Sequence, residues 1–261
     1  MQPIAFLHLT DPHVAPPGET LAGQDTGARF EAAVTAIAAR HAWGGDAPAA
    51  FAVITGDLTR DGESAAYARL ATLVARLPCP AHLMMGNHDS RIAFAEAFPQ
   101  APRDPGGFIQ HAFATPAGRC ILLDTLEPGA PHGTLCARRL GWLADRLAEE
   151  DGPVLLFLHH PPLPVGIPGM DAIALRAPEA LWAVLAPHAG RIRHIFHGHL
   201  HRPIAGSWHG IPLSSLRGTA FEVRMHGGKP AIEPDAPIDY GYVRADADGI
   251  VIHTERVAPL A

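Results

Sequence analysis

The stretch FHGHLHRP, residues 196–203, places three histidines at alternate positions directly after a short apolar run. Alternate side chains of an extended chain point to the same face, so His197, His199 and His201 could line one surface. A bound metal ion would explain this grouping, because imidazole is a common metal ligand. The chain holds 17 histidines in 261 residues, however, and chance alone brings some of them together. The triplet therefore needs support from the rest of the chain.

Short apolar runs alternate with amphipathic stretches along the sequence. Between the first two runs Phe30, Val34 and Ile37 recur at helical spacing, and Asp25 or Thr26 fits the N-cap of that helix. The strand-like runs lie at residues 4–9, 51–55, 81–85, 154–158 and 194–196. This alternation of strand-like and helical patterns predicts an α/β fold.

A polar cluster follows each of the strand-like runs. The clusters are TDPH (10–13), TGDL (55–58), GNHD (86–89), LHHPP (158–162) and GHLH (198–201). In open α/β sheets, ligands bind in the crevice beyond the carboxyl ends of the strands. We therefore expect the five clusters to converge in space although they are far apart in the sequence.

The clusters offer carboxylate, amide and imidazole donors and no thiolate. Such a mixed set suits Mn, Fe, Co or Zn ions, whereas Ca²⁺ prefers oxygen ligands alone. Seven ligands are too many for one tetrahedral ion but fit two ions about 3.5–4 Å apart, the arrangement used for phosphoryl hydrolysis. The candidate ligands are Asp11, His13, Asp57, Asn87, His159, His199 and His201.

The ordered set D-x-H, G-D, G-N-H-D, H-H-P-P and G-H-x-H resembles that of the calcineurin-like metallophosphoesterases. This resemblance implies two divalent or trivalent metal ions with Asp57 as the bridging ligand. Asp11, His13, Asp57 and His201 would hold one ion. Asp57, Asn87, His159 and His199 would hold the other.

The resemblance also assigns the remaining histidines of the motifs. His88 would contact the phosphate together with Asn87 and protonate the leaving oxygen, so that His88, Asp57 and Asn87 form the catalytic set. His159 is favoured over His160 as the ligand because the family uses the first histidine after the strand. His160 would point elsewhere, and His197 falls outside the motif. For Asp89 an orienting and a plain structural role stay open, and we assign no role to Arg60, Asp61 or Arg217.

Within the family, the sequence is most similar to bacterial class III cyclic-nucleotide phosphodiesterases and glycerophosphodiesterases, over residues 4 to 221. The resemblance implies a four-layer αββα sandwich, two packed mixed sheets flanked by helices. It also implies hydrolysis of small phosphodiesters by in-line attack of a metal-bridging hydroxide. Two alternatives stay open: a phosphomonoesterase or nucleotide pyrophosphatase on the same metal core, and a non-catalytic scaffold of the same fold. The intact ligand set argues against the scaffold.

Composition limits the partners. A formal charge of −6 and the scarcity of Lys and Arg in segments 125–135 and 161–176 favour a small-molecule substrate over a long nucleic acid. These two segments are where we expect substrate selectivity to lie. No apolar run approaches the roughly 20 residues that a membrane-spanning helix needs.

The organisation expected from the sequence is a single domain over residues 1–261. Its strand-rich region from about residue 220 to 261 would complete a sheet or aid assembly into a homo-oligomer. Cys79, Cys120 and Cys136 are odd in number and form no C-x-x-C pair, and the N-terminus lacks an export signal. Both features favour a cytoplasmic location.

Overall fold

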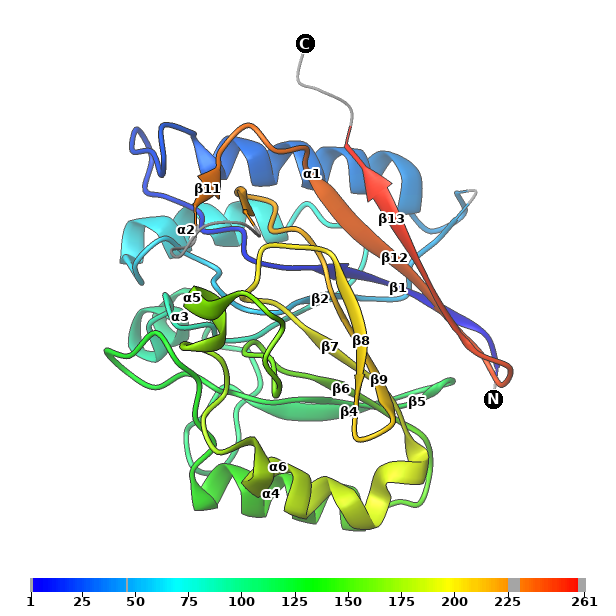
Figure 1. The fold of residues 1–261 in the computed structure, drawn as a ribbon. Coiled ribbons are helices and arrows are strands. Elements are labelled where there is room, and N and C mark those ends of the chain that lie inside the picture. Colours follow the sequence, from blue (N-terminus) through cyan, green and yellow to red (C-terminus); the bar gives the residue numbers. More distant parts are fainter. Residues whose placement is uncertain (1, 46, 225–230, 258–261) are drawn as a thin grey trace.

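The computed structural model describes residues 2–45, 47–224 and 231–257. Two large sheets form the centre of the molecule (Figure 1). The first sheet has the order β13 (Ile250–Arg256), β12 (Asp239–Ala245), β1 (Ile4–Leu9), β2 (Ala52–Ile54) and β3 (Ala81–Leu83). The second has the order β4 (His111–Thr115), β5 (Gly118–Leu122), β6 (Val154–Phe157), β7 (Ile192–His197), β9 (Ile211–Ser215) and β8 (Ile204–Trp208). A small third sheet pairs β10 (Glu222–Val223) with β11 (Ile232–Glu233).

Both large sheets are mixed. Strands β1, β2 and β3 are parallel, and β12 joins β1 in the antiparallel direction. In the second sheet β5, β6, β7 and β9 are parallel, while the edge strands β4 and β8 are antiparallel to their neighbours. The C-terminal strands β12 and β13 thus extend the first sheet. The organisation as a single domain stays a prediction.

The helices cover the two outer faces of the sheet pair (Figure 1). Along β1 the side chains alternate: Leu7 packs with α1 residues such as Phe30, whereas Phe6 packs against Phe157 and Phe196 of the other sheet. The helices are α1 (Thr26–His41), α2 (Ser64–Val74), α3 (Arg91–Ala97), α4 (Ala137–Ala148), α5 (Pro168–Asp171), α6 (Pro178–Leu185) and the 3₁₀ helix η1 (Ala186–Arg191). Helices α4 and α6 pack on the second sheet. This confirms the expected four-layer αββα sandwich.

The parallel strands of the two sheets end at the same side of the sandwich. Figure 1 shows β1 running from the N-terminus toward the side where α5 and β11 lie. The polar clusters of the sequence follow the ends of β1, β2, β3, β6 and β7, so the fold brings them to this side. None of the described helices is long and apolar enough to cross a membrane.

Candidate metal centre

The candidate ligands form two buried groups at the strand ends. In the first group Asp11, His13, Asp57 and His201 each offer a ligand atom, and these atoms lie within 4.8 Å of one another. A second group with the same spacing consists of His159, His160 and His199. The convergence expected from the sequence is therefore present in the structure.

Asp57 lies between the two groups. Its Oδ2 is 3.3 Å from His13 Nε2, and its Oδ1 is 3.4 Å from His159 Nε2. The side-chain oxygen of Asn87 is 3.3 Å from the same His159 nitrogen, which places Asn87 beside the second group. A bridging ligand needs one carboxylate that reaches both groups, and Asp57 has this position.

The ring nitrogens of the site fit metal ions. His13 Nε2 and His201 Nε2 lie 3.1 Å apart and can share at most one proton, whereas a metal ion could bind both lone pairs. His199 Nε2 is buried with no hydrogen-bond partner among the residues that the structure describes. A buried mixed nitrogen and oxygen set of this kind matches Mn, Fe, Co or Zn rather than Ca²⁺.

The backbone at the ligands adopts an unusual conformation. Asp11, His13, Asp57, His199 and His201 all have positive φ, between 40° and 70°. Residues with a side chain rarely adopt this left-handed region, and such strain clusters at functional sites. In the D-x-H and H-x-H motifs both candidate ligand residues have a positive φ. The backbone therefore turns sharply at each of these residues, and both side chains of a motif can face the same centre.

The glycines of the motifs permit close approach of the loops. A Cβ atom on Gly86 would lie 2.2 Å from Asp57 Oδ1, and one on Gly198 would lie 2.2 Å from Thr10 Oγ1. Real Cβ atoms do not tolerate such distances, so any larger residue would push the GNHD or GHLH loop away from the ligands. This explains the glycines of these two motifs in steric terms.

Several residues that the sequence did not single out hold the ligands in place. The ring of Phe221 stacks on His201 at 4.1 Å between centroids, and its carbonyl oxygen is 3.3 Å from His201 Nδ1. Thr10 Oγ1 donates to Asp11 Oδ2 at 2.6 Å, and the Thr55 carbonyl lies 2.7 Å from His159 Nδ1. Such contacts fix the orientation of a metal ligand and the nitrogen that it presents. Thr10 and Thr55 adjoin the motifs in the sequence, but nothing in the sequence points to Phe221.

The pKa values of the histidines in the site differ widely. Burial disfavours the charged form of His159, but the neighbouring carboxylate of Asp57 outweighs it and raises the pKa of His159 to about 9. Burial, followed by the influence of His159, lowers the pKa of His199 to about 3. Metal ligation requires the neutral imidazole, so protons and metal ions compete for His159 while His199 is already neutral.

His88 lies at the rim of the site, with 41% of its side chain exposed. Its ring is 4.8 Å from that of His13, and its Nδ1 donates to the carbonyl oxygen of Arg60 at 2.7 Å. Asp61 lies 3.5 Å from the same nitrogen. Arg60 and Asp61, to which we assigned no role from the sequence, thus engage His88 Nδ1 and orient the ring.

Asp89 has a structural role in this arrangement. Its carboxylate accepts hydrogen bonds from the backbone amides of Gly86, Leu58 and Thr59 and from the hydroxyl of Tyr67. It therefore ties the GNHD loop to the loop that follows β2. Of the two roles left open for Asp89, these contacts favour the structural one.

The two other histidines differ from each other. His197 is fully buried and belongs to neither group, in keeping with its position outside the motif. His160 does not point away from the centre as expected, because one of its ring nitrogens lies in the second group. His159 nevertheless remains the better ligand candidate, since it alone of the pair lies beside both Asp57 and Asn87.

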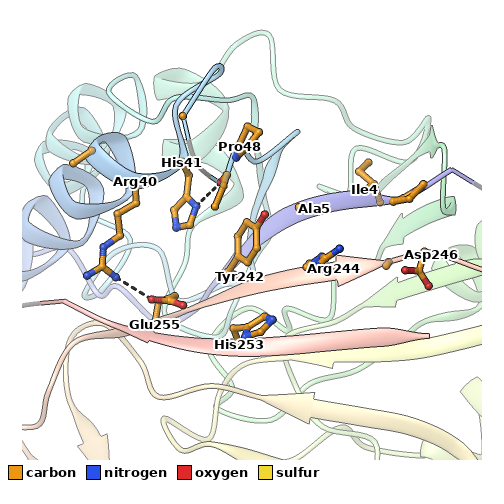
Figure 2. Close-up of a pocket in the computed structure, with 15 residues that line it drawn as sticks. Ile4, Ala5, Arg40, His41, Pro48, Tyr242, Arg244, Asp246, His253 and Glu255 are labelled. Atoms are coloured by element: carbon orange, nitrogen blue, oxygen red, sulfur yellow. Dashed lines mark hydrogen bonds and ion pairs between the residues drawn. The ribbon is translucent and has the colours of Figure 1, made fainter. Parts of the chain in front are cut away.

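A separate hollow of about 1060 Å³ lies at the other end of β1 (Figure 2). Figure 2 shows Tyr242 and His253 from β12 and β13 beside it, with Arg40 of α1 paired to Glu255. Its lining includes Pro3 to Ala5 at the start of β1 and none of the candidate ligands, which follow the strand ends. The hollow is therefore distinct from the candidate metal centre.

The sandwich, with its cluster of buried Asp and His side chains and the half-buried Asn87 beside them, is the fold of a phosphoesterase. The chain belongs to the calcineurin-like phosphoesterase family, whose model matches residues 4–203. Family membership implies a dinuclear metal centre, although it does not specify the metals. The resemblance inferred from the motifs is thereby confirmed.

Individual proteins similar to this chain are named as phosphoesterases as well. The chain is 44% identical to a probable cyclic nucleotide phosphodiesterase of Rhodopseudomonas palustris, over 95% of this chain and 90% of that protein. It is 32% identical to the 3′,5′-cyclic adenosine monophosphate phosphodiesterase CpdA of Escherichia coli, over 90% of this chain and 82% of that protein. Among solved structures, a dimetal phosphatase from Danio rerio has a TM-score of 0.68 at 16% identity, covering 98% of this chain and 99% of that one. This last similarity supports the fold alone.

Proposed function

We propose that the chain is a binuclear metal-dependent phosphodiesterase that hydrolyses small phosphodiesters such as cyclic nucleotides or glycerophosphodiesters. The position of Asp57 between two groups of buried ligand side chains carries this proposal. The relatives named as cyclic nucleotide phosphodiesterases, which align over nearly the whole chain, support the choice of a diester.

The contacts support two metal positions. Asp11, His13, Asp57 and His201 would hold the first ion, and Asp57, Asn87, His159 and His199 the second. When bound, the ions would supply charge neutralisation at the phosphoryl oxygens and a water of lowered pKa. Only two of the ligands are carboxylates, so the site would stay electropositive within an acidic protein and attract an anionic substrate.

His88 and Asn87 have the remaining roles in this proposal. Because the carbonyl of Arg60 accepts from His88 Nδ1, the Nε2 atom is the one that exchanges a proton with the leaving oxygen. Partial burial of His88 disfavours its charged form, but Asp57, the Arg60 carbonyl and Asp61 together outweigh this and raise the pKa of His88. A raised pKa favours the protonated imidazole that a general acid needs near neutral pH.

The substrate is expected to be small. Segment 125–135 contains no Lys or Arg, and segment 161–176 contains only Arg176. A long nucleic acid requires many basic contacts to its phosphates. A cytoplasmic location is consistent with the free cysteines Cys79, Cys120 and Cys136. Assembly into a homo-oligomer stays a prediction.

The test combines metal analysis with hydrolysis. Purified protein should contain close to two equivalents of metal and cleave bis(p-nitrophenyl) phosphate and 3′,5′-cyclic AMP. Chelation should abolish both activities, and Mn²⁺ should restore them. The matched monoester, p-nitrophenyl phosphate, is the control: if it is cleaved faster than the diester under the same metal loading, the enzyme is a phosphomonoesterase. Metal without any cleavage would indicate a scaffold.

A further inference from the structure

His160 connects the metal centre to the loop at 125–135. The residue is fully buried, and its ring lies 4.8 Å from that of His159 and 4.6 Å from that of His199. On its other side, Nδ1 lies 2.8 Å from the hydroxyl of Thr125, at the start of the loop. One imidazole thus contacts two metal-ligand candidates and a segment expected to select the substrate.

The same loop rests on the His160 ring at Gly133. A Cβ atom on Gly133 would lie 2.5 Å from His160 Cγ, so only a glycine lets the backbone approach the ring this closely. The Thr134 amide donates to the Thr125 carbonyl at 3.0 Å and closes the loop between its two contacts with His160. Both ends of the loop are therefore fixed to one side chain.

Gly133 also joins this loop to the 161–176 loop. Its amide donates to the Ala174 carbonyl at 3.3 Å, and its carbonyl accepts from the Arg176 amide at 2.8 Å. The Leu175 amide donates to the Pro161 carbonyl at 3.1 Å, next to His160 in the chain. Gly133 thus donates to one residue of the 161–176 loop and accepts from another. Because of this pair of bonds, a displacement of one loop should displace the other.

The far end of the 161–176 loop reaches the other metal position. Ile167 and Met170 pack in one buried cluster with Leu200 and Phe221. Leu200 separates the candidate ligands His199 and His201, and Phe221 stacks on His201. In Figure 1, α5 of this loop lies at the side where β1, β6 and β7 end. The paired loops therefore flank both groups of ligands.

We propose that His160 is a positioning residue that holds the 125–135 and 161–176 loops as one unit beside the metal centre, and that this unit binds the part of the substrate beyond the phosphate. The inference rests on the proposed phosphodiesterase function. His160 itself need not touch the substrate. Its effect passes through Thr125 and Gly133, so loosening either contact should weaken substrate binding while the metal ions stay bound.

The first experiment measures loop coupling without any substrate. Hydrogen exchange is followed in peptides covering 126–135 and 162–176 for the parent, Thr125→Val, Thr125→Ser and Gly133→Ala. Thr125→Val, which loses the hydroxyl, and Gly133→Ala, which adds bulk against the His160 ring, should each speed exchange in both loops by roughly tenfold. Thr125→Ser keeps the hydroxyl and should match the parent. The control, Thr72→Val, removes an exposed hydroxyl on α2 that bonds only locally. Faster exchange in one loop alone, or in neither, overturns the proposal.

The second experiment separates binding from chemistry. With 3′,5′-cyclic AMP, Thr125→Val should raise KM by about tenfold with kcat within about twofold of the parent. Metal content should stay at two equivalents. Loss of metal from Thr125→Val would mean that His160 serves the metal and not the loops, and an unchanged KM would refute the role in binding. If the parent cleaves neither bis(p-nitrophenyl) phosphate nor 3′,5′-cyclic AMP, the proposed function fails, but the exchange result still decides whether His160 couples the loops.

Discussion

Asp57 is the residue on which both metal positions depend, because its two carboxylate oxygens face different histidines. Asp57→Ala should therefore remove both ions, whereas Asn87→Ala should remove chiefly the second. Turnover should fall to background in the first variant and strongly in the second, since each loses a ligand. Metal content by elemental analysis and cleavage of bis(p-nitrophenyl) phosphate measure both effects.

The control for these variants is Asp151→Ala, which alters an exposed carboxylate after α4. It should keep two ions and full activity. Two bound ions together with full turnover in Asp57→Ala or Asn87→Ala would show that the assignment of ligands is wrong.

His88 should behave differently from the ligands. Its ring nitrogen Nδ1 is engaged by the Arg60 carbonyl, and the residue lies at the rim of the site. His88→Ala should keep both metal ions and lower kcat by about 10²–10⁴, the usual effect of a lost general acid. Metal analysis and kcat for the diester test this, and loss of metal from the variant would make His88 a ligand.

The convergence of the candidate ligands could be predicted from the sequence, but most of the contacts that orient them could not. Motif glycines and strand ends indicate Asp11 or His199 because the signal is local. Phe221 lies outside every motif, and its stacking on His201 depends on a turn that the sequence pattern does not encode. The contacts of His160 with Thr125 and Gly133 could not be predicted either, because those residues follow a different strand from His160.

The start of helix α1 is hydrogen-bonded to the loop that carries His13, a ligand of the proposed first metal position. Thr26, the first residue of the helix, donates from Oγ1 to the His13 carbonyl at 2.6 Å and accepts from the Ala15 amide at 3.1 Å. Thr26→Val should leave both buried backbone groups unpaired and weaken metal binding at the first position by about 10–100-fold. Thr26→Ser should restore binding.

Competition titration with a chromogenic chelator measures this effect. The matched control is Thr35→Val, an exposed threonine in the same helix, which should leave the metal affinity unchanged. An unchanged affinity in Thr26→Val would show that the D-x-H loop keeps its shape without the helix.

Several strands of both sheets could be predicted from the sequence, including the edge strand β3, whereas others could not. The run at 4–9 is β1, and Asp25 caps α1 by accepting from the Ala28 amide. Strands β4 and β8 are the two edges of the second sheet and were not predicted, and neither was β5 between β4 and β6. An edge strand is less enclosed and needs no continuous apolar run, so HAFAT and IAGSW carry a weak pattern.

The packing order of the layers is a property of the whole chain. Periodicity predicts strands and helices but does not indicate that β12, near the C-terminus, pairs with β1. The family resemblance supplied that architecture, and the structure confirms it. The sequence pattern also does not reveal that histidines occupy the buried space within and beside the two sheets.

Buried and half-buried histidines should make the stability of the whole molecule depend on pH. Burial, followed by His197 and His194, lowers the pKa of His8 to about 3, and burial lowers the pKa of His82 and His111 to about 4. In the unfolded chain a histidine titrates near 6.5. Between these values the unfolded chain binds more protons than the folded one, so the free energy of unfolding should fall as the pH drops from about 6.5 toward 4.

His8 offers the cleanest test of this dependence, because it is fully buried and its Nε2 lies 3.0 Å from the hydroxyl of Thr55. His8→Gln can keep a hydrogen bond at that position and cannot titrate. Urea unfolding of the chelated protein at pH 7 and pH 5 should show that the variant loses about 2 kcal/mol less stability than the parent over this interval. Ile37→Val, a core change without a titratable group, should lower stability equally at both pH values. If the parent and His8→Gln lose the same stability on acidification, His8 is not held neutral in the folded protein, and acid sensitivity comes from other groups such as His82, His111 or the candidate metal ligands.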